Sequence, residues 1–187
     1  MNKTFKERFS YDWVLYLLVL VISISGWTAI YGIYHSPKNY EKIDIFFAGV
    51  INDYSFENEA LNYLANTSLI EINISSSNTN DASFNTKYNV VGLNNSDIVF
   101  IPKSIASKTK CKETFNEIKD SYNQEFFIQE DKKYGIIINN DIKEKLNKYF
   151  NFTSEEYVIL FNEISVNCGK ITNNSYDLVK WMVNYEI

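Results

Sequence analysis

Residues that could carry out chemistry are sparse in this 187-residue chain. Its single histidine is His35, so the residues beyond it offer no imidazole to act as the base of a Ser–His or Cys–His arrangement. Cys111 and Cys168 could bind zinc together with carboxylates, but their spacing matches no zinc motif. The six glycines are scattered and form no phosphate-binding loop. We therefore expect neither a cofactor nor a metal.

Carboxylate pairs are the remaining catalytic possibility, because two acids can hydrolyse a glycosidic bond. Asp53, Glu57 and Glu59 follow the first apolar segment of the second part of the chain, and Glu130 and Asp131 belong to a charged turn. Acids in such positions are usually solvated surface residues, and we interpret them in this way. The sequence therefore predicts a protein that is not an enzyme.

Polar residues that follow three predicted strands could instead bind a ligand. In open α/β sheets, ligands lie beyond the carboxyl ends of the strands. The candidates at these ends are Asn52, Asp53, Tyr54, Ser76, Asn78, Lys103 and Ser104. Their amides, hydroxyls, aromatic ring and ammonium group suit a small polar solute. The alternative is that these segments are polar only because they are surface loops.

The two cysteines leave two alternatives open. In an exported domain they would meet an oxidising or redox-neutral space, where Cys111 and Cys168 could form a disulfide. Equally, each could be a small and separate core residue. Neither follows an apolar stretch closely enough to carry a lipid anchor.

One uncharged stretch, Trp13 to Tyr34, determines where the rest of the chain is held. About 20 apolar residues cross a bilayer core, so this stretch predicts a transmembrane helix. Three basic residues precede it, whereas Lys38 and Lys42 follow it among acids, which favours a cytoplasmic N-terminus. The alternative is a signal peptide cleaved before Gly26, but apolar residues continue past that site.

The predicted organisation is that of a single-pass protein of the cell membrane. It comprises a cytoplasmic tail (1–12), a transmembrane helix (13–34), a linker (35–41) and an extracytoplasmic α/β domain (42–187). A hydrophobic fraction of 45% is sufficient for a core in that domain. The net charge of −5, with dispersed acids, argues against nucleic acid as a partner.

Hydrophobic periodicity predicts the elements that position the candidate residues. Strands at 44–50, 69–74 and 97–101 alternate with helices at 56–65 and around 84–91, which implies a mostly parallel sheet with flanking helices. The elements predicted in the second half are a helix at 113–122, a hairpin of strands 126–129 and 134–139, a helix at 141–150, a strand at 156–162 and a closing helix at 175–185.

The order of the segments KIDIFFAG, DIVFIPKS, KKYGIIINN, EEYVILFN and SYDLVKWMVNY resembles the extracellular solute-binding proteins of bacterial ABC importers. It is also similar to small single-span proteins found with such transporters. The resemblance implies one lobe of a type II periplasmic-binding fold, because residues 42–187 are too few for two lobes and a hinge.

This resemblance implies a membrane-anchored, solute-binding-like module that binds or presents a small polar solute beside an ABC transporter permease. The alternative is an interaction or assembly subunit of a membrane protein complex that binds no solute. A concave, aromatic-lined pocket at the three strand ends would favour the first function, and a flat apolar patch with no pocket there would favour the second.

Overall fold

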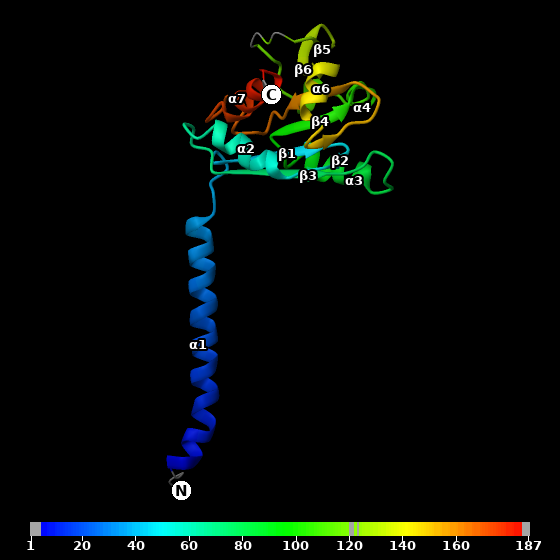
Figure 1. Cartoon of the computed structure of the whole chain (residues 1–187). Helices are drawn as coiled ribbons and strands as arrows, with labels where there is room; N and C mark the ends of the chain where they lie inside the picture. The colour runs from blue at the N-terminus through cyan, green and yellow to red at the C-terminus, as the bar shows by residue number, and fades with distance from the viewer. Residues whose placement is uncertain (1–4, 120–121, 123, 185–187) are drawn as a thin grey trace. The chain divides into compact units, whose positions relative to one another are not determined.

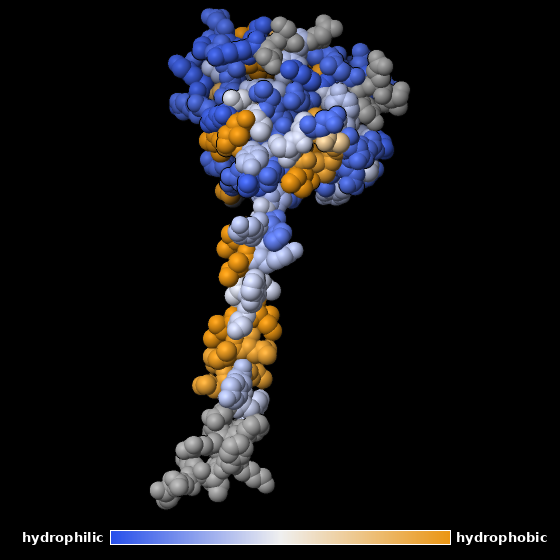
Figure 2. Space-filling view, turned by 90° about the vertical axis from the view of Figure 1, so that its left-hand side faces the viewer, coloured by the Kyte–Doolittle hydropathy of each residue, from blue (hydrophilic) through white to orange (hydrophobic). Residues whose placement is uncertain are grey.

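The computed structural model describes residues 5–119, 122 and 124–184. The chain divides between Ser36 and Pro37 into two compact units. The first contains helix α1 (Phe5–His35; Figure 1), in which the segment Trp13–His35 has a mean hydropathy of 2.1 and no buried residue. By length and composition, α1 is the one helix among the described residues that could cross a membrane. Its consecutive apolar residues at 13–22 place apolar side chains around the helix, and Figure 2 shows apolar surface on the face in view.

The second unit is built on a six-stranded sheet (Figure 1) with the strand order β3-β1-β4-β8-β6-β5. Its strands are β1 (Lys42–Phe47), β3 (Glu71–Ser76), β4 (Ile98–Pro102), β5 (Phe126–Gln129), β6 (Lys132–Ile138) and β8 (Tyr157–Phe161). β1 pairs in parallel with both β3 and β4, whereas the pairs β4–β8, β8–β6 and β6–β5 are antiparallel. Two short strands, β2 (Val50–Ile51) and β7 (Phe150–Asn151), form a separate antiparallel ribbon.

Helices cover both faces of this sheet. One core includes Phe47 of β1 and side chains of α2 (Ser55–Tyr63), α6 (Asn140–Leu146) and α7 (Asn174–Asn184). The opposite core includes Phe46 of β1 and side chains of α3 (Phe84–Lys87), η1 (Tyr88–Leu93, a π-helix), α4 (Lys103–Ala106) and α5 (Cys111–Thr114). Adjacent residues of a strand point to opposite faces, so Phe46 and Phe47 enter different cores. Every residue of β4 and β8 is buried, as expected for strands covered on both sides.

The predicted α/β class and the N-terminal apolar helix are confirmed, but the sheet is mixed. Parallel pairing is confined to β3, β1 and β4. The predicted hairpin is present, and its two-residue turn consists of Glu130 and Asp131, which have φ angles of 50° and 61°. Two positive φ values match the right-handed twist of paired strands. The resemblance to a periplasmic-binding lobe stays a prediction.

The helix predicted at 113–122 is wrong beyond Thr114; residues 120 and 121 lie outside the described residues. α5 ends at Thr114, and Phe115 then forms a β-bridge with Asn162. The amide of Ile118 donates to the carbonyl of Lys133 at 2.7 Å. Phe115 and Ile118 enter opposite cores, because an odd spacing in an extended chain reverses the side-chain direction.

Two further predicted elements are shorter than expected. The strand predicted at 44–50 is interrupted at Ala48 and Gly49, so that β2 pairs with β7 and leaves the main sheet. The helix predicted at 141–150 ends at Leu146, and Phe150 belongs to β7. Burial of Phe150 against Phe47 and Phe56, at ring-centroid distances of 4.9 and 5.1 Å, accounts for this turn of the chain.

Candidate functional site

The carboxyl edge of the sheet, where β1, β3 and β4 end, was the predicted place for a ligand. Parallel pairing puts Ser76, the last residue of β3, and Lys103, which follows β4, at this edge. Asn52, Asp53 and Tyr54 lie beyond β2, where the amides of Asn52 and Asp53 donate to the carbonyl of Tyr149. The polar segment after β2 is therefore fixed to the chain before β7.

Lys103 and Ser104 bond to neighbouring carboxylates. The Lys103 Nζ lies 2.7 Å from Glu156 Oε2, and the Ser104 hydroxyl donates to Glu155 Oε2 at 2.6 Å. The hydrogen bond to Glu156 raises the pKa of Lys103, and the same bond lowers the pKa of Glu156. Both polar groups thus have partners on the segment that leads into β8.

Asp53 and its neighbours also bond within the domain. The Asp53 carboxylate accepts from the amide and the hydroxyl of Ser55, at 2.8 and 2.7 Å, where α2 begins. These two bonds, the amide bond first, lower the pKa of Asp53. The side-chain amide of Asn52 donates to the carbonyl of Asn147 at 3.0 Å, and Asn78 Oδ1 accepts from the amide of Asn80. Tyr54 is also exposed, with 59% of the residue accessible to solvent.

The candidates lie outside four surface cavities that the described part of the domain contains. Four surface cavities of about 360 to 520 Å³ lie there, and none of the seven predicted residues lines any of them. The structure therefore places the predicted residues near one edge of the sheet, and they line none of these four cavities.

The acids considered for catalysis interact with groups of the domain or form a turn. Glu59 accepts from Lys148 Nζ at 2.8 Å and from the Tyr149 hydroxyl. Burial raises the pKa of Glu57, which also interacts with the backbone amide of Ile74 in the edge strand β3. Glu130 and Asp131 form the hairpin turn. Each acid thus has a local structural role.

Both cysteines are free thiols, and they lie in opposite cores. Cys168 is in the core with α2 and α7, whereas Cys111 is in the core with η1 and α4, so the sheet separates them. Burial raises the pKa of each thiol to about 11. Of the two alternatives left by the sequence, the structure has separate core residues and no disulfide between them. Among the described residues, no group of three or more His, Cys, Asp or Glu side chains could hold a metal ion.

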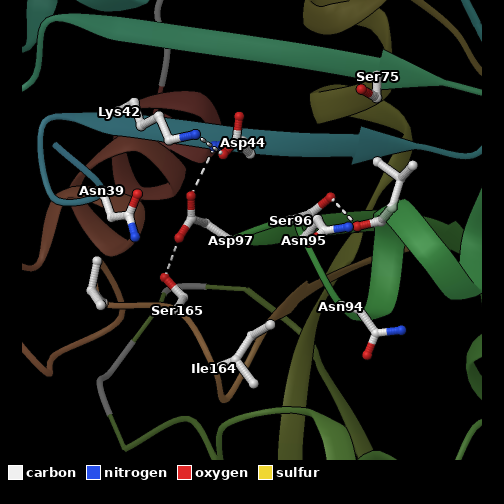
Figure 3. A pocket seen from close by; sticks show the side chains of 12 residues that line it. Asn39, Lys42, Asp44, Ser75, Asn94, Asn95, Ser96, Asp97, Ile164 and Ser165 are labelled. Carbon is white, nitrogen blue, oxygen red and sulfur yellow. Dashed lines mark hydrogen bonds and ion pairs between the residues drawn. The ribbon is translucent and has the colours of Figure 1, made fainter. Parts of the chain in front are cut away.

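The amino edge of the same strands, by contrast, contains a polar cavity of about 450 Å³, which we call the amino-edge pocket (Figure 3). Its lining comes from the segment before β1 and the start of β1, from Ser75 near the end of β3, from η1 and the loop before β4, and from the loop after β8. The residues are Asn39, Lys42, Asp44, Ser75, Val91, Asn94, Asn95, Ser96, Asp97, Ile164, Ser165 and Val166.

Asp97 is the central group of this pocket and is only 8% exposed. Its carboxylate accepts from the amide of Asp44 at 2.8 Å and from the hydroxyl of Ser165 (Figure 3). The side-chain amide of Asn167 donates to it at 3.3 Å. Burial raises the pKa of Asp97 above its ordinary value, although these three bonds oppose the shift. The network joins the starts of β1 and β4 to the loop after β8.

Asn167 extends this network to the beginning of the domain. It is fully buried, and its side-chain amide also donates to the carbonyls of Asn39 and Lys42, at 3.0 and 2.7 Å. Lys42 in turn forms an ion pair with Asp44 at 3.1 Å. The inner polar groups of the pocket are therefore bonded to one another. Its outer wall consists of exposed side chains such as Asn94, Asn95 and Ile164.

Sequence reasoning missed the amino-edge pocket. The rule for open α/β sheets directs attention to the carboxyl ends of strands, which is the opposite edge. Asp97 gave a weak signal, since an acid directly before the apolar run IVFIP is a candidate for a buried polar group. Asn167 gave none, because its partners lie about 125 residues earlier in the chain.

Comparison with known proteins assigns the chain to no family. No protein-family model matches the chain, and no curated protein matches it either.

Proposed function

We propose that this protein is a membrane-anchored interaction or assembly subunit, whose α/β domain lies outside the cytoplasm and contacts another membrane protein. The observation that carries this proposal is the state of the carboxyl edge. Lys103, Ser104 and Asp53 are bonded to groups of the domain itself, and none of the candidate residues lines a described cavity.

The membrane anchor in this proposal rests on α1. The segment Trp13–His35 is long and apolar enough to cross a bilayer, and its side chains are exposed. Figure 2 shows this apolar surface along the helix, in contrast to the largely hydrophilic surface of the second unit. The extracytoplasmic position of the domain rests on the basic residues before the span and the mixed charges after it.

A partner protein would contact the edges of the domain, since helices cover both faces of the central strands. Near the carboxyl edge, Val50 is 46% exposed and Tyr54 is 59% exposed. Exposed aromatic residues are enriched in protein interfaces because a rigid ring buries much area at a small entropic cost. We therefore expect Tyr54 to be a contact residue.

Photo-crosslinking in intact cells tests this function. A benzophenone amino acid in place of Tyr54 of the full chain should give one discrete adduct with a membrane protein. The same substitution at Ile128 is the matched control, because Ile128 is an exposed residue of β5, the outermost strand on the far side of the sheet from β3. A discrete adduct at Tyr54 that is lost at Ile128 supports the proposal, and the lack of any adduct at Tyr54 contradicts it.

Solute binding beside an ABC transporter permease is the second candidate, and the amino-edge pocket favours it. A polar cavity of about 450 Å³ has the size of many small-ligand sites. Sugars, amino acids and peptides should then raise the melting temperature of the full chain in detergent. The variant Asn95→Ala, in the outer wall, should abolish that increase. If no solute in the panel raises the melting temperature, the interaction function is the better account.

A further inference from the structure

The amino edge of the sheet presents three exposed isoleucines. Ile70, Ile164 and Ile171 are 62%, 55% and 65% exposed. Large aliphatic side chains on a domain surface are common singly, but a group of them beside one edge is typical of a contact surface.

Hydrogen bonds and the lining of the amino-edge pocket place the three isoleucines near the segment through which the chain enters the domain. The amide of Ile70 donates to the carbonyl of Glu41 at 2.7 Å. The amide of Ile171 donates to the carbonyl of Val166, and the next residue, Asn167, holds the carbonyl of Asn39. Ile164 lines the amino-edge pocket together with Asn39. The three side chains therefore share one edge with residues 39–41.

The length of the chain between α1 and this edge is short. Three residues separate His35, the last residue of α1, from Asn39. At about 3.6 Å per extended residue, this connection spans at most about 14 Å. The limit follows from covalent geometry alone and holds for any orientation of the two units. If α1 spans a bilayer, Asn39 must lie within about 14 Å of the end of the spanning helix, which is little more than twice the ~6 Å thickness of the headgroup layer.

We infer that this edge, with Ile70, Ile164 and Ile171, rests on the lipid surface and inserts its isoleucines among the headgroups. Lys38 and Tyr40 fit the same location: the Lys38 Nζ lies 3.2 Å from the Tyr40 hydroxyl and 5.6 Å from the centre of its ring. Lysine and tyrosine are residues that settle at the membrane–water boundary, because each combines an apolar body with a polar end.

The charges around the isoleucines indicate which lipids this surface accepts. Lys38 and Lys170 are exposed, and Glu41 and Glu163 lie on the same segments. Because these charges offset one another, attraction to anionic lipid is weak, and burial of apolar side chains drives the contact. The surface should therefore bind zwitterionic lipid as well as anionic lipid. This inference rests on the membrane anchor of the proposed function, but not on the identity of any protein partner.

Spin-label accessibility of the full chain in phosphatidylcholine nanodiscs tests the inference. A label is attached to single cysteines introduced as Ile164→Cys or Ile171→Cys. Val50→Cys is the matched control, because Val50 is also an exposed aliphatic residue but lies beyond the opposite end of β1. The native thiols are buried, with pKa values of about 11, and labelling of the unmodified chain measures their contribution.

Labels at 164 and 171 should collide several-fold less often with a water-soluble nickel chelate than the label at 50. They should remain accessible to oxygen, which dissolves in lipid. The same result is expected when anionic lipid is added. Equal nickel accessibility at all three positions would overturn the inference. Protection from both nickel and oxygen would also overturn it, because a protein and not lipid would then cover the surface.

A label at Leu18→Cys separates this inference from the proposed anchor. Leu18 lies within the apolar segment of α1. A lipid-exposed label at 18 with water-exposed labels at 164 and 171 retains the anchor and rejects the lipid-facing edge. A water-exposed label at 18 rejects the anchor itself. Thermal unfolding of each labelled chain, compared with the unmodified chain, establishes that the exposed substitutions leave the fold intact.

Discussion

The polar side chains at the carboxyl and amino edges of the parallel strands differ in their exposure to solvent. At the carboxyl edge, Lys103 and Glu156 form an ion pair whose side chains are 41% and 57% exposed. At the amino edge, Asp97 is 8% exposed and Asn167 is fully buried. Exposed ion pairs contribute little stability because water screens them, whereas a buried network leaves costly unsatisfied groups when one member is removed. At the carboxyl edge, which was expected to bind a ligand, the polar side chains thus bond to one another at the surface. At the amino edge they bond to one another in the interior.

The largest expected effect is that of Asn167→Ala at the amino edge. This change removes the donor to the carbonyls of Asn39 and Lys42 and to the Asp97 carboxylate. We expect the free energy of unfolding to fall by roughly 3 kcal/mol, because several buried acceptors lose their partner. Denaturant unfolding of the full chain in detergent, followed by near-UV circular dichroism, measures it. Asn94→Ala, an exposed residue of the same pocket, should cause little change.

A smaller loss is expected at the carboxyl edge from Asn139→Ala. Asn139 follows β6, and its side-chain oxygen accepts from the amide of Ile142 at 2.9 Å to cap α6. Loss of an N-cap of this kind destabilises a protein by about 1 kcal/mol. The same unfolding measurement applies, with the exposed neighbour Asn140→Ala as control. A loss as large as that of Asn167→Ala would break the contrast between the edges.

The stability linked to an acid at the amino edge and that linked to an acid at the carboxyl edge should change with pH in opposite directions. Burial raises the pKa of Asp97, so the folded state binds its proton more tightly than the unfolded state does. The stability linked to Asp97 is therefore fully present below the unfolded pKa and is lost as the pH rises through the folded pKa. From pH 4 upward, the unfolding free energy of the unmodified chain should therefore fall relative to that of Asp97→Asn.

Asp53, at the carboxyl edge, should behave in the opposite way. Its bonds to Ser55 lower its pKa, so the stability linked to it is present above the unfolded pKa and is lost as the pH falls through the folded pKa. Unfolding of Asp53→Asn across the same pH range measures this contribution. If the unfolding free energies of the Asp53 and Asp97 variants, relative to the unmodified chain, changed with pH in the same way, burial would not distinguish the two edges.

The smallest effect is expected for Lys103→Gln, which removes the ion pair with Glu156. Because both side chains are largely exposed, stability at physiological salt should not change measurably. Unfolding at low and physiological salt tests this point. A marked loss that persists at physiological salt would mean that the pair organises the carboxyl edge, and the comparison would need revision.

Much of the fold could be predicted because local pattern and burial agreed. The apolar runs at 97–101 and 156–162 predicted strands, and β4 and β8 are present there and buried throughout. The prediction failed at 113–122, where Phe115, Ile118 and Tyr122 have helical spacing. There the chain instead bonds to β8 and β6 through Asn116 and Ile118, and no local pattern encodes partners so distant in sequence.

The candidate site was predicted in part. Ser76 and Lys103 do lie at the carboxyl edge, because parallel strand ends follow from the order of the elements. Whether their polar groups remain available could not be read from the chain, since Glu155 and Glu156 are about 50 residues from Ser104 and Lys103. The amino-edge pocket was missed for the same reason: Asp97, Ser165 and Asn167 meet only in three dimensions.

The sequence by itself determined the apolar helix, the α/β class and the short connection between His35 and Asn39. These properties depend on consecutive residues, through hydropathy, period and chain length. Tertiary structure alone decided that β8 pairs antiparallel with β4 and β6, that Cys111 and Cys168 are in opposite cores, and that the amino edge contains the buried network. Each of these depends on contacts between distant segments, which form when the chain buries its apolar side chains on both faces of one sheet.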